Sequence, residues 1–368
     1  MLIYAEALPK YKDILKGLLL PHPIKSGEQN EPFGYYYGFG RKAIFDAGVS
    51  ISGSNNGEIW FPAYICDDLI QIFRKKWQGQ IKFYDIKDDF SPDFDSIKSD
   101  ENSENKSSIF VLVHYFGFPN SKEKVKEFCS LKKMHLIEDG AHVFPDDNIQ
   151  DKLSGDAFVF SLRKIFPLPD GALLFISEKN KKTLNKKKIE TGIPLQWIIR
   201  VILKRIYRYI PATIYGLKPI IRDDMKPEEE VEGFERGITK ISLCLFNNFK
   251  ESFEQIKTLR RDNYLLLQNR LIKAGIKPIL KLDNSEVCPF VFAFKSKNRD
   301  GIIKSLRNLG IAAQFWPTLP VEIRESNLYP VAKKIQSELV ILPVHQELSL
   351  KDMEFIVNSM KKVKNHAG

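Results

Sequence analysis

Cysteine and long apolar runs are scarce in this sequence, and each shortage argues against a class of protein. The four cysteines, Cys66, Cys129, Cys244 and Cys288, are scattered, with no CxxC pair and no histidine cluster beside them. This pattern argues against a disulfide framework or a zinc site and predicts free thiols in a reducing compartment. No apolar run is long enough to cross a bilayer. The N-terminus has no basic stretch followed by an apolar core, so we expect no signal peptide.

The overall composition is that of a soluble globular protein. The chain has 368 residues, of which 43% are hydrophobic and 28% charged, enough for one large domain and a smaller one. The formal net charge is +10, which is compatible with nucleic acid, an anionic membrane surface or phosphorylated ligands. No zinc-finger, RRM-like or helix-turn-helix pattern accompanies this charge, so we expect no nucleic-acid partner.

The middle of the first half alternates strand and helix. Apolar, β-rich runs occur in "SSIFVLVHYFG", "HLIEDG", "DAFVFSL" and "GALLFIS". Between the first two runs we expect a helix that begins after Ser121 and places Val125, Phe128 and Leu131 on one face. Strand, helix and strand at this spacing predict an α/β fold with a mostly parallel sheet. Ligands of such sheets bind beyond the carboxyl ends of the strands.

The flanking segments extend this pattern. Upstream, we expect a Gly-rich turn entering a helix in "GFGRKAIFDAGV", a strand, proline turn and helix in "GEIWFPAYICDDLIQIFRKKW", and a strand in "IKFYDI". Downstream, a helix-rich segment is followed by mixed strands and helices. The polar, acidic stretch "RDDMKPEEEVEGFERG" places a domain change near residues 225–240.

Polar side chains gather at two of the predicted strand ends. Glu138, Asp139 and His142 follow one strand, and Ser161 and Lys164 follow a neighbouring strand. Taken singly, residues of these types are more often structural or solvated. Together, they place an acid, an imidazole, a hydroxyl and an amine on one rim of the sheet.

This combination has a chemical rationale. A nucleophilic lysine needs a desolvated or cation-lined site, and the apolar neighbours of Lys164 and the adjacent Arg163 are suited to supply one. A lysine that binds pyridoxal phosphate also needs an acid that keeps the pyridine nitrogen protonated. The phosphate requires backbone N–H groups at a helix N-terminus, which the turn carrying Gly38 and Gly40 is placed to offer.

With these residues in place, the chain resembles the DegT/StrS family of sugar aminotransferases, which are fold-type I enzymes that use pyridoxal 5'-phosphate. The similarity spans nearly the whole chain and is most specific in "EDGAH" and "LPVHQELS". "GRKAIFDAG", "WFPAYIC" and "IKFYDIKDDFSPDFDSI" also resemble family segments. Two stretches depart from the family pattern. "PLPDGA" stands where Gly-Glu-Gly-Gly is common, and "GFERGITK" stands where the family has Gly-x-Asn-x-Arg.

The resemblance implies a role for each matching residue. Lys164 is implied as the catalytic lysine that binds the cofactor and shuttles a proton. Asp139 is implied to pair with the pyridine nitrogen, and His142 to lie beside the ring or its phenolic oxygen. The phosphate contacts are implied to come from Ser161, Gly40, Arg41 and Lys42. Tyr64, or the residue at Cys66, is implied to stack on the ring.

The resemblance also implies the organisation and function of the whole chain. It predicts an N-terminal arm over residues 1–34, a large cofactor-binding domain over 35–235 and a small α+β C-terminal domain over 236–368. The implied activity is transfer of an amino group, from a donor such as glutamate, to a nucleotide-linked keto-sugar for surface polysaccharide or lipopolysaccharide biosynthesis. We expect a cytoplasmic homodimer without a resident metal. The alternatives are a sugar dehydratase and a non-catalytic, membrane-surface-associated relative.

Residues 191–222 are basic and contain no Asp or Glu. Arg200, Lys204 and Arg208 would form one stripe of a helix, with leucines and isoleucines on the opposite side. The favoured interpretation is a helix that packs on the core by its apolar face and exposes a basic one. Two alternatives remain open. Residues 195–210 would rest on anionic lipid at the inner face of the membrane, or the cations would meet the diphosphate of a nucleotide sugar.

Overall fold

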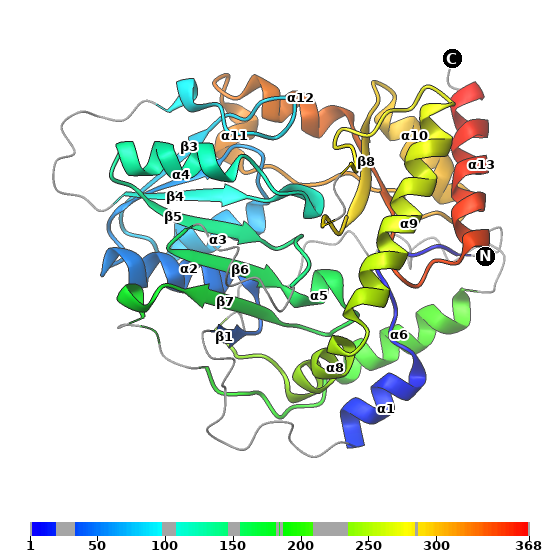
Figure 1. Ribbon diagram of the computed structural model, residues 1–368, viewed down its shortest axis with the longest axis horizontal. Helices are drawn as coiled ribbons and strands as arrows, with labels where there is room; N and C mark the ends of the chain where they lie inside the picture. Colours follow the sequence, from blue (N-terminus) through cyan, green and yellow to red (C-terminus); the bar gives the residue numbers. More distant parts are fainter. Residues whose placement is uncertain are drawn as a thin grey trace.

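A computed structural model describes residues 2–19, 34–97, 108–145, 155–181, 184, 187–208, 235–283 and 286–366. Its larger sheet has seven strands in the order β1-β7-β6-β5-β4-β2-β3 (Figure 1). The strands are β1 (Gly34–Tyr37), β2 (Glu58–Pro62), β3 (Gln80–Tyr84), β4 (Ser108–Val113), β5 (His135–Gly140), β6 (Ala157–Ser161) and β7 (Ala172–Ile176). Only β7 among them runs against its neighbours, β6 and β1. The predicted, mostly parallel sheet is therefore confirmed.

The central strands are apolar runs because both faces of the sheet are covered. Every residue of β2, β6 and β7 is buried, as are five of the six residues of β4 and of β5. The helices of this part are α2 (Gly40–Ser52), α3 (Asp67–Lys76), α4 (Lys122–Leu131), α5 (Leu162–Ile165) and α8 (Lys240–Lys250). α2 ends at Gly53, whose φ of 71° is the left-handed conformation that a helix C-terminus favours.

The C-terminal part is a smaller α+β unit. Its two-stranded antiparallel sheet, β8 (Val291–Lys295) and β9 (Leu339–Pro343), packs with helices (Figure 1). The helices are α9 (Phe253–Ile272), α10 (Arg299–Asn308), α11 (Val321–Glu325), α12 (Pro330–Glu338) and α13 (Leu350–His366). The N-terminal segment packs on this part, because Ile3 exchanges backbone hydrogen bonds with Gly310 and Ala312 at 2.8 and 2.9 Å. The domain limits stay a prediction, since residues 209–234 lie outside the described residues.

The predicted buried face of α4 is wrong at the C-terminal end of the helix. In α4, Val125 and Cys129 are buried, but Leu131 is 76% exposed. Six residues along an α-helix turn the side chain by about 240°, so Leu131 lies about 120° away from the buried line through Val125. Ser121 precedes α4 as expected, although its side chain makes no capping hydrogen bond.

The basic helix α6 (Leu195–Tyr207) is oriented opposite to the favoured prediction. Most of its apolar side chains face solvent, with Leu195 61% exposed, whereas Trp197 and Ile198 are partly buried and Val201 is buried. Two of its cations, Arg205 and Arg208, instead turn toward the N-terminal and C-terminal segments. The amphipathic pattern established that two faces exist, but ion pairs with the rest of the chain decided which face points inward. Within the described part of the chain, no helix combines the length and apolarity needed to cross a membrane.

Candidate active site

Three neighbouring parallel strands end together and bring the predicted polar residues to one edge. Val113 of β4, Asp139 of β5 and Val159 of β6 are aligned in register. His114 follows β4, and Ser161 ends β6. The short helix α5 begins directly after Ser161 and carries Lys164. The polar residues predicted for the carboxyl ends of the parallel strands therefore lie along one edge of the sheet.

Lys164 and His142 meet at this edge. The lysine Nζ lies 3.3 Å from His142 Nε2, and His142 Nδ1 accepts a hydrogen bond from the Phe116 N–H at 3.3 Å. A neutral imidazole that accepts at Nδ1 carries its proton on Nε2 and donates there. The lysine amine and the imidazole are therefore within hydrogen-bond distance of each other at the predicted site.

The imidazole of His142 is enclosed by aromatic rings. It stacks on Phe116 and Phe290, with centroid distances of 5.8 and 4.7 Å, and meets the Trp316 ring edge-on at 4.9 Å. Burial, helped by the Lys164 charge, lowers the pKa of His142 well below its usual value. The ring is therefore held neutral, as the hydrogen-bond pattern requires.

Trp316 is a site residue that sequence reasoning missed. The Lys164 Nζ lies 5.7 Å from its ring centroid. The Tyr64 hydroxyl donates a hydrogen bond to the Trp316 carbonyl, and the two rings meet at 6.0 Å. Tyr64 is thus fully buried in an aromatic cluster, and Trp316 contacts both Tyr64 and the lysine. Trp316 comes from the C-terminal part of the chain, and no local pattern around it announces a site.

Asp139 is the buried acid of the site. Its Oδ1 accepts a hydrogen bond from the Ala141 N–H at 2.9 Å. Burial raises the pKa of Asp139, and the nearby Lys164 charge opposes this shift. An acid in such a place can hold a proton on a basic ring nitrogen, because the resulting ion pair is shielded from water.

A second buried pair, His114 and Glu138, lies next to Asp139; the sequence placed Glu138 at this strand end but did not indicate His114 as its partner. His114 Nδ1 accepts a hydrogen bond from the Asn120 N–H, so its Nε2 donates to Glu138 at 2.9 Å. The other Glu138 oxygen accepts from the Gly155 N–H at 2.8 Å. The His114 N–H donates to the Asp139 carbonyl at 3.0 Å. These contacts fix the ends of β4 and β5 relative to each other.

The predicted phosphate loop lies beside the end of β6. Phe39 precedes α2 in an extended conformation, and its side chain makes no capping hydrogen bond. A Cβ on Gly40 would lie 3.8 Å from the Val159 side chain and 4.0 Å from that of Ala172, which pairs with Ser161. The first-turn N–H groups of α2 and Ser161 are therefore neighbours, an arrangement suited to an anion.

The two cations predicted for the phosphate lie differently. The Arg41 guanidinium stacks over the Phe39 ring at 4.9 Å, next to the start of α2. The Lys42 amine is buried and pairs with Asp46 and, at 3.1 Å, with Glu235. The structure therefore gathers Gly40, Arg41 and Ser161 in one region, while acids of its own chain hold Lys42.

The two segments that depart from the family pattern, "PLPDGA" and "GFERGITK", contact each other. Asp170 of "PLPDGA" is buried and accepts hydrogen bonds from the Thr239 N–H and hydroxyl and from the Ser242 hydroxyl, at 3.1, 2.9 and 2.6 Å. Its other oxygen lies 3.7 Å from Arg236 of "GFERGITK". Arg236 stacks on the same Phe39 ring, at 5.1 Å. The two segments thus form one unit against the loop that starts α2.

The donor set fits pyridoxal phosphate. An amine, a buried acid aligned with the neighbouring strand, and an uncapped helix N-terminus with a hydroxyl beside it match the aldehyde, ring nitrogen and phosphate of that cofactor. Within the described ranges, no group of three His, Cys, Asp or Glu residues could hold a metal ion.

Comparison with known proteins gives matches at low identity and high coverage. A dTDP-4-amino-4,6-dideoxy-D-glucose transaminase of Shigella dysenteriae is 22% identical over 271 residues, covering 70% of this chain and 67% of that protein. A DegT/DnrJ/EryC1/StrS aminotransferase of Brucella abortus superposes with a TM-score of 0.66 at 15% identity, over 95% and 94% of the two chains. The PLP form of Spr1654 from Streptococcus pneumoniae superposes with a TM-score of 0.70 at 14% identity, over 100% and 99%. No family model matches the chain.

The fold is therefore that of the fold-type I pyridoxal-phosphate-dependent aminotransferases. The proteins to which the chain is similar are sugar aminotransferases or aminotransferases of the DegT/DnrJ/EryC1/StrS type, in line with the resemblance seen in the sequence.

Proposed function

We propose that this chain is a pyridoxal-phosphate-dependent aminotransferase that acts on a nucleotide-linked keto-sugar, with glutamate as amino donor. One observation carries the proposal. The Lys164 amine lies 3.3 Å from the Nε2 of a buried, neutral histidine, on the sheet edge that also carries Asp139. Geometry of this kind suits a lysine that reacts with a carbonyl carbon, and it does not suit a solvated surface charge.

Each residue has a task in the proposed reaction. Pyridoxal phosphate, when bound, supplies an aldehyde carbon for an amine and an electron sink for the carbanion. Asp139 holds a proton on the ring nitrogen, which keeps that sink effective. Lys164 Nζ takes a proton from one carbon and returns it to another. His142 Nε2, at hydrogen-bond distance, orients the lysine amine, and the surrounding rings exclude water from the transfer.

The substrate class rests on the relatives and on the cations near α2. The Shigella dysenteriae relative is a transaminase of a dTDP-linked amino sugar by its name. In this chain, Arg41 and Arg236 both stack on Phe39 beside the start of α2. Two planar guanidinium groups at such a rim are suited to a diphosphate, which each can bind in a bidentate manner.

The remaining expectations belong to the same proposal. A homodimer, a cytoplasmic location, a role in surface polysaccharide biosynthesis, and domains divided at residues 34/35 and 235/236 follow from the family resemblance. Contact of residues 195–210 with anionic lipid concerns another face of the molecule, because α6 packs on the N-terminal and C-terminal segments.

The central test is spectroscopic. Purified protein mixed with pyridoxal phosphate should show a visible absorbance band that borohydride fixes, and Lys164→Ala should abolish the fixation. Lys179→Ala is the matched control, because Lys179 is an exposed lysine whose amine pairs with Asp156. Glutamate should then bleach the wild-type band and yield its 2-oxo acid in a single turnover.

Three outcomes would count against the proposal. Unchanged fixation in Lys164→Ala would overturn the lysine assignment. Wild-type protein that binds no cofactor would support a non-catalytic relative. Cofactor binding without a reaction with glutamate would favour the dehydratase or a different donor.

A further inference from the structure

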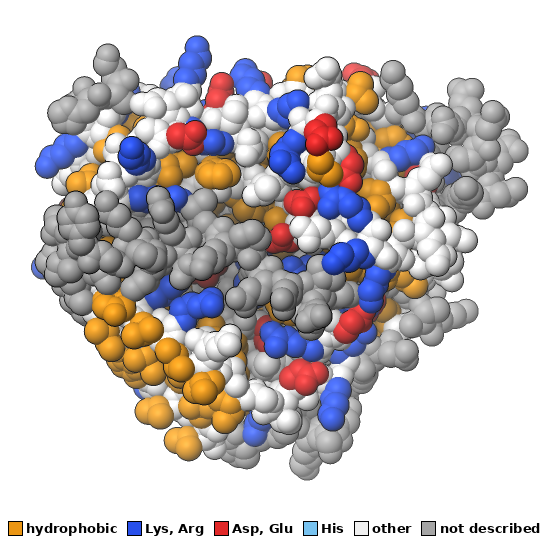
Figure 2. Space-filling view, turned by 180° about the vertical axis from the view of Figure 1, so that it is seen from behind, with side chains coloured by type: hydrophobic (Ala, Val, Ile, Leu, Met, Phe, Trp, Pro, Cys, Tyr) orange, Lys and Arg blue, Asp and Glu red, His pale blue; other side chains and the backbone are white. Residues whose placement is uncertain are grey.

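Two helices expose apolar side chains on one face of the molecule. In α1 (Tyr11–Leu19) and α6, these side chains recur at helical spacing, i, i+4, i+7 and i+8, so each helix presents a stripe. Figure 2 shows apolar side chains gathered at the lower left, where the half-turn from Figure 1 places α1 and α6. We call this face the α1–α6 surface. It comprises Tyr11, Leu15, Leu18 and Leu19 of α1 and Leu195, Ile199, Ile202, Leu203 and Ile206 of α6, all at least 37% exposed.

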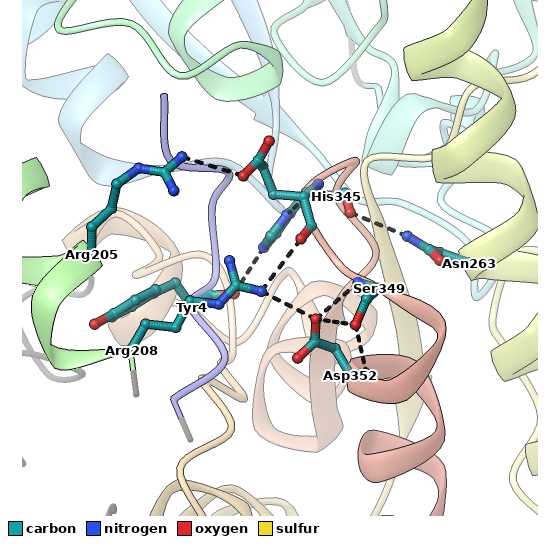
Figure 3. A network of polar contacts seen from close by, with 8 residues as sticks. Tyr4, Arg205, Arg208, Asn263, His345, Ser349 and Asp352 are labelled. Carbon is teal, nitrogen blue, oxygen red and sulfur yellow. Dashed lines mark hydrogen bonds and ion pairs between the residues drawn. The ribbon is translucent and has the colours of Figure 1, made fainter. Parts of the chain in front are cut away.

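The orientation of α6 is held by its own cations. Arg205 donates to the Leu8 carbonyl at 2.7 Å, and its guanidinium lies over the Tyr11 ring at the start of α1. Arg208 reaches Asp352 at 3.1 Å (Figure 3). These cations fix the inner side of α6, so the apolar side is left facing outward by tertiary contacts.

The orientation of α1 is fixed from the opposite side. Ile14 and Gly17 are buried, and a Cβ on Gly17 would lie 3.0 Å from Ile241 and 3.3 Å from Leu245, both in α8. α1 therefore approaches α8 closely through a glycine and turns Leu15 and Leu19 away from it. The two helices, each also anchored to the rest of the chain, thus expose their apolar stripes on a common side.

We infer that the α1–α6 surface is a docking face for an anionic lipid bilayer. Exposed cations accompany the apolar stripes, namely Lys10, Lys12, Lys16 and Arg200. α6 contains no acid, and the single acid of α1, Asp13, accepts a hydrogen bond from the Lys10 N–H. Apolar side chains beside lysine and arginine, on helices that lie along the surface, are the features of interfacial membrane binding.

The charges favour lipid over a second copy of the chain. A two-fold contact through this face would bring its net positive charge against the same net positive charge of the other copy. Like charges that face each other oppose association. Anionic headgroups supply the complementary charge, while leucine and isoleucine side chains enter the boundary between headgroups and acyl chains. This inference is independent of the proposed catalytic activity.

Vesicle cosedimentation with the full-length chain tests the inference. We expect binding to vesicles that contain phosphatidylglycerol, weaker binding at high salt, and little binding to pure phosphatidylcholine. Leu15→Asp combined with Ile199→Asp should reduce affinity at least tenfold, since both positions are exposed. Lys12→Gln and Arg200→Gln should each reduce affinity about fivefold, as expected for the loss of one cation near an anionic surface.

Leu131→Asp is the matched control, because Leu131 is an exposed leucine on α4. It should bind vesicles as the wild type does, and circular dichroism should show all variants folded. Absence of wild-type binding at low salt, or equal binding by the Leu15/Ile199 variant, would overturn the inference. If the same variant instead abolished a concentration-dependent dimer seen by ultracentrifugation, the occupant would be a second copy and the lipid assignment would be wrong.

Discussion

At the scale of single residues, buried histidines hold definite protonation states through paired backbone contacts. His142 accepts at Nδ1 from a backbone N–H and presents its Nε2 to Lys164. His345 uses the same arrangement. Its Nδ1 accepts from the Glu347 N–H at 3.3 Å, and its Nε2 donates to the Tyr4 carbonyl at 3.1 Å (Figure 3). In each case, a backbone donor selects the tautomer, and burial keeps the ring uncharged.

His345 should make the protein less stable in acid. Burial, together with the Arg260 charge, lowers the pKa of His345 to about 3 from 6.5. Between these pH values the unfolded chain binds a proton that the folded chain does not, so the free energy of unfolding falls as pH falls. This histidine should contribute a slope of up to about 1.4 kcal/mol per pH unit. His345→Gln cannot titrate, so urea unfolding between pH 6.5 and 4 should show a shallower slope. An unchanged slope would contradict the prediction.

At the scale of elements, the sequence predicted which segments form strands and helices. It did not predict which residues bind the helix ends or which face of a helix is buried. The buried runs of β4 to β7 and the starts of α2 and α3 follow from local composition and turn residues. Asp170 stands far from α8 in the sequence, yet its carboxylate accepts hydrogen bonds from the N–H and hydroxyl of Thr239, which precedes the helix, and from the Ser242 hydroxyl. Sequence inspection identified Asp170 only as part of "PLPDGA", a segment that departs from the family pattern. Its partner is set by the packing of two loops against the start of α2.

Asp170→Ala should destabilise the protein through the start of α8. Three hydrogen bonds to a buried carboxylate are lost, and the Thr239 N–H is left without its acceptor. The free energy of unfolding should fall by about 2 kcal/mol in denaturant titration. Asp88→Ala is the control, because Asp88 pairs with Lys295 at the surface and should cost less than about 1 kcal/mol. Equal effects of the two substitutions would refute a capping role.

At the scale of the whole molecule, one buried arginine joins the two parts of the chain near the site. Arg260 of α9 donates to the Ile165 carbonyl at 2.9 Å, directly after Lys164. It also donates to the Gln346 side chain at 2.8 Å and to the Phe290 carbonyl at 3.3 Å. Burial lowers the pKa of this guanidinium, so its hydrogen bonds must compensate for lost hydration. The lysine helix is thereby tied to the C-terminal part that supplies Trp316.

Arg260→Met should loosen this connection. Three buried or partly buried acceptors would lose the hydrogen bond that Arg260 donates, so the free energy of unfolding should fall by about 2 kcal/mol. Bound pyridoxal phosphate should also dissociate faster, because the backbone beside Lys164 is released. Arg270→Met, at an exposed position of the same helix, should leave both stability and dissociation unchanged. Stability loss with unchanged cofactor dissociation would show that Arg260 does not position the lysine.

The sequence by itself determined the alternation of strands and helices and the grouping of Asp139, His142 and Lys164, since periodicity and strand ends are local properties. Tertiary structure alone decided that Trp316 and Phe290 enclose the site, because packing joins residues distant in the chain. It also decided which side of α6 faces outward. An amphipathic helix defines two faces, and only the partners of Arg205 and Arg208 determined which one is buried.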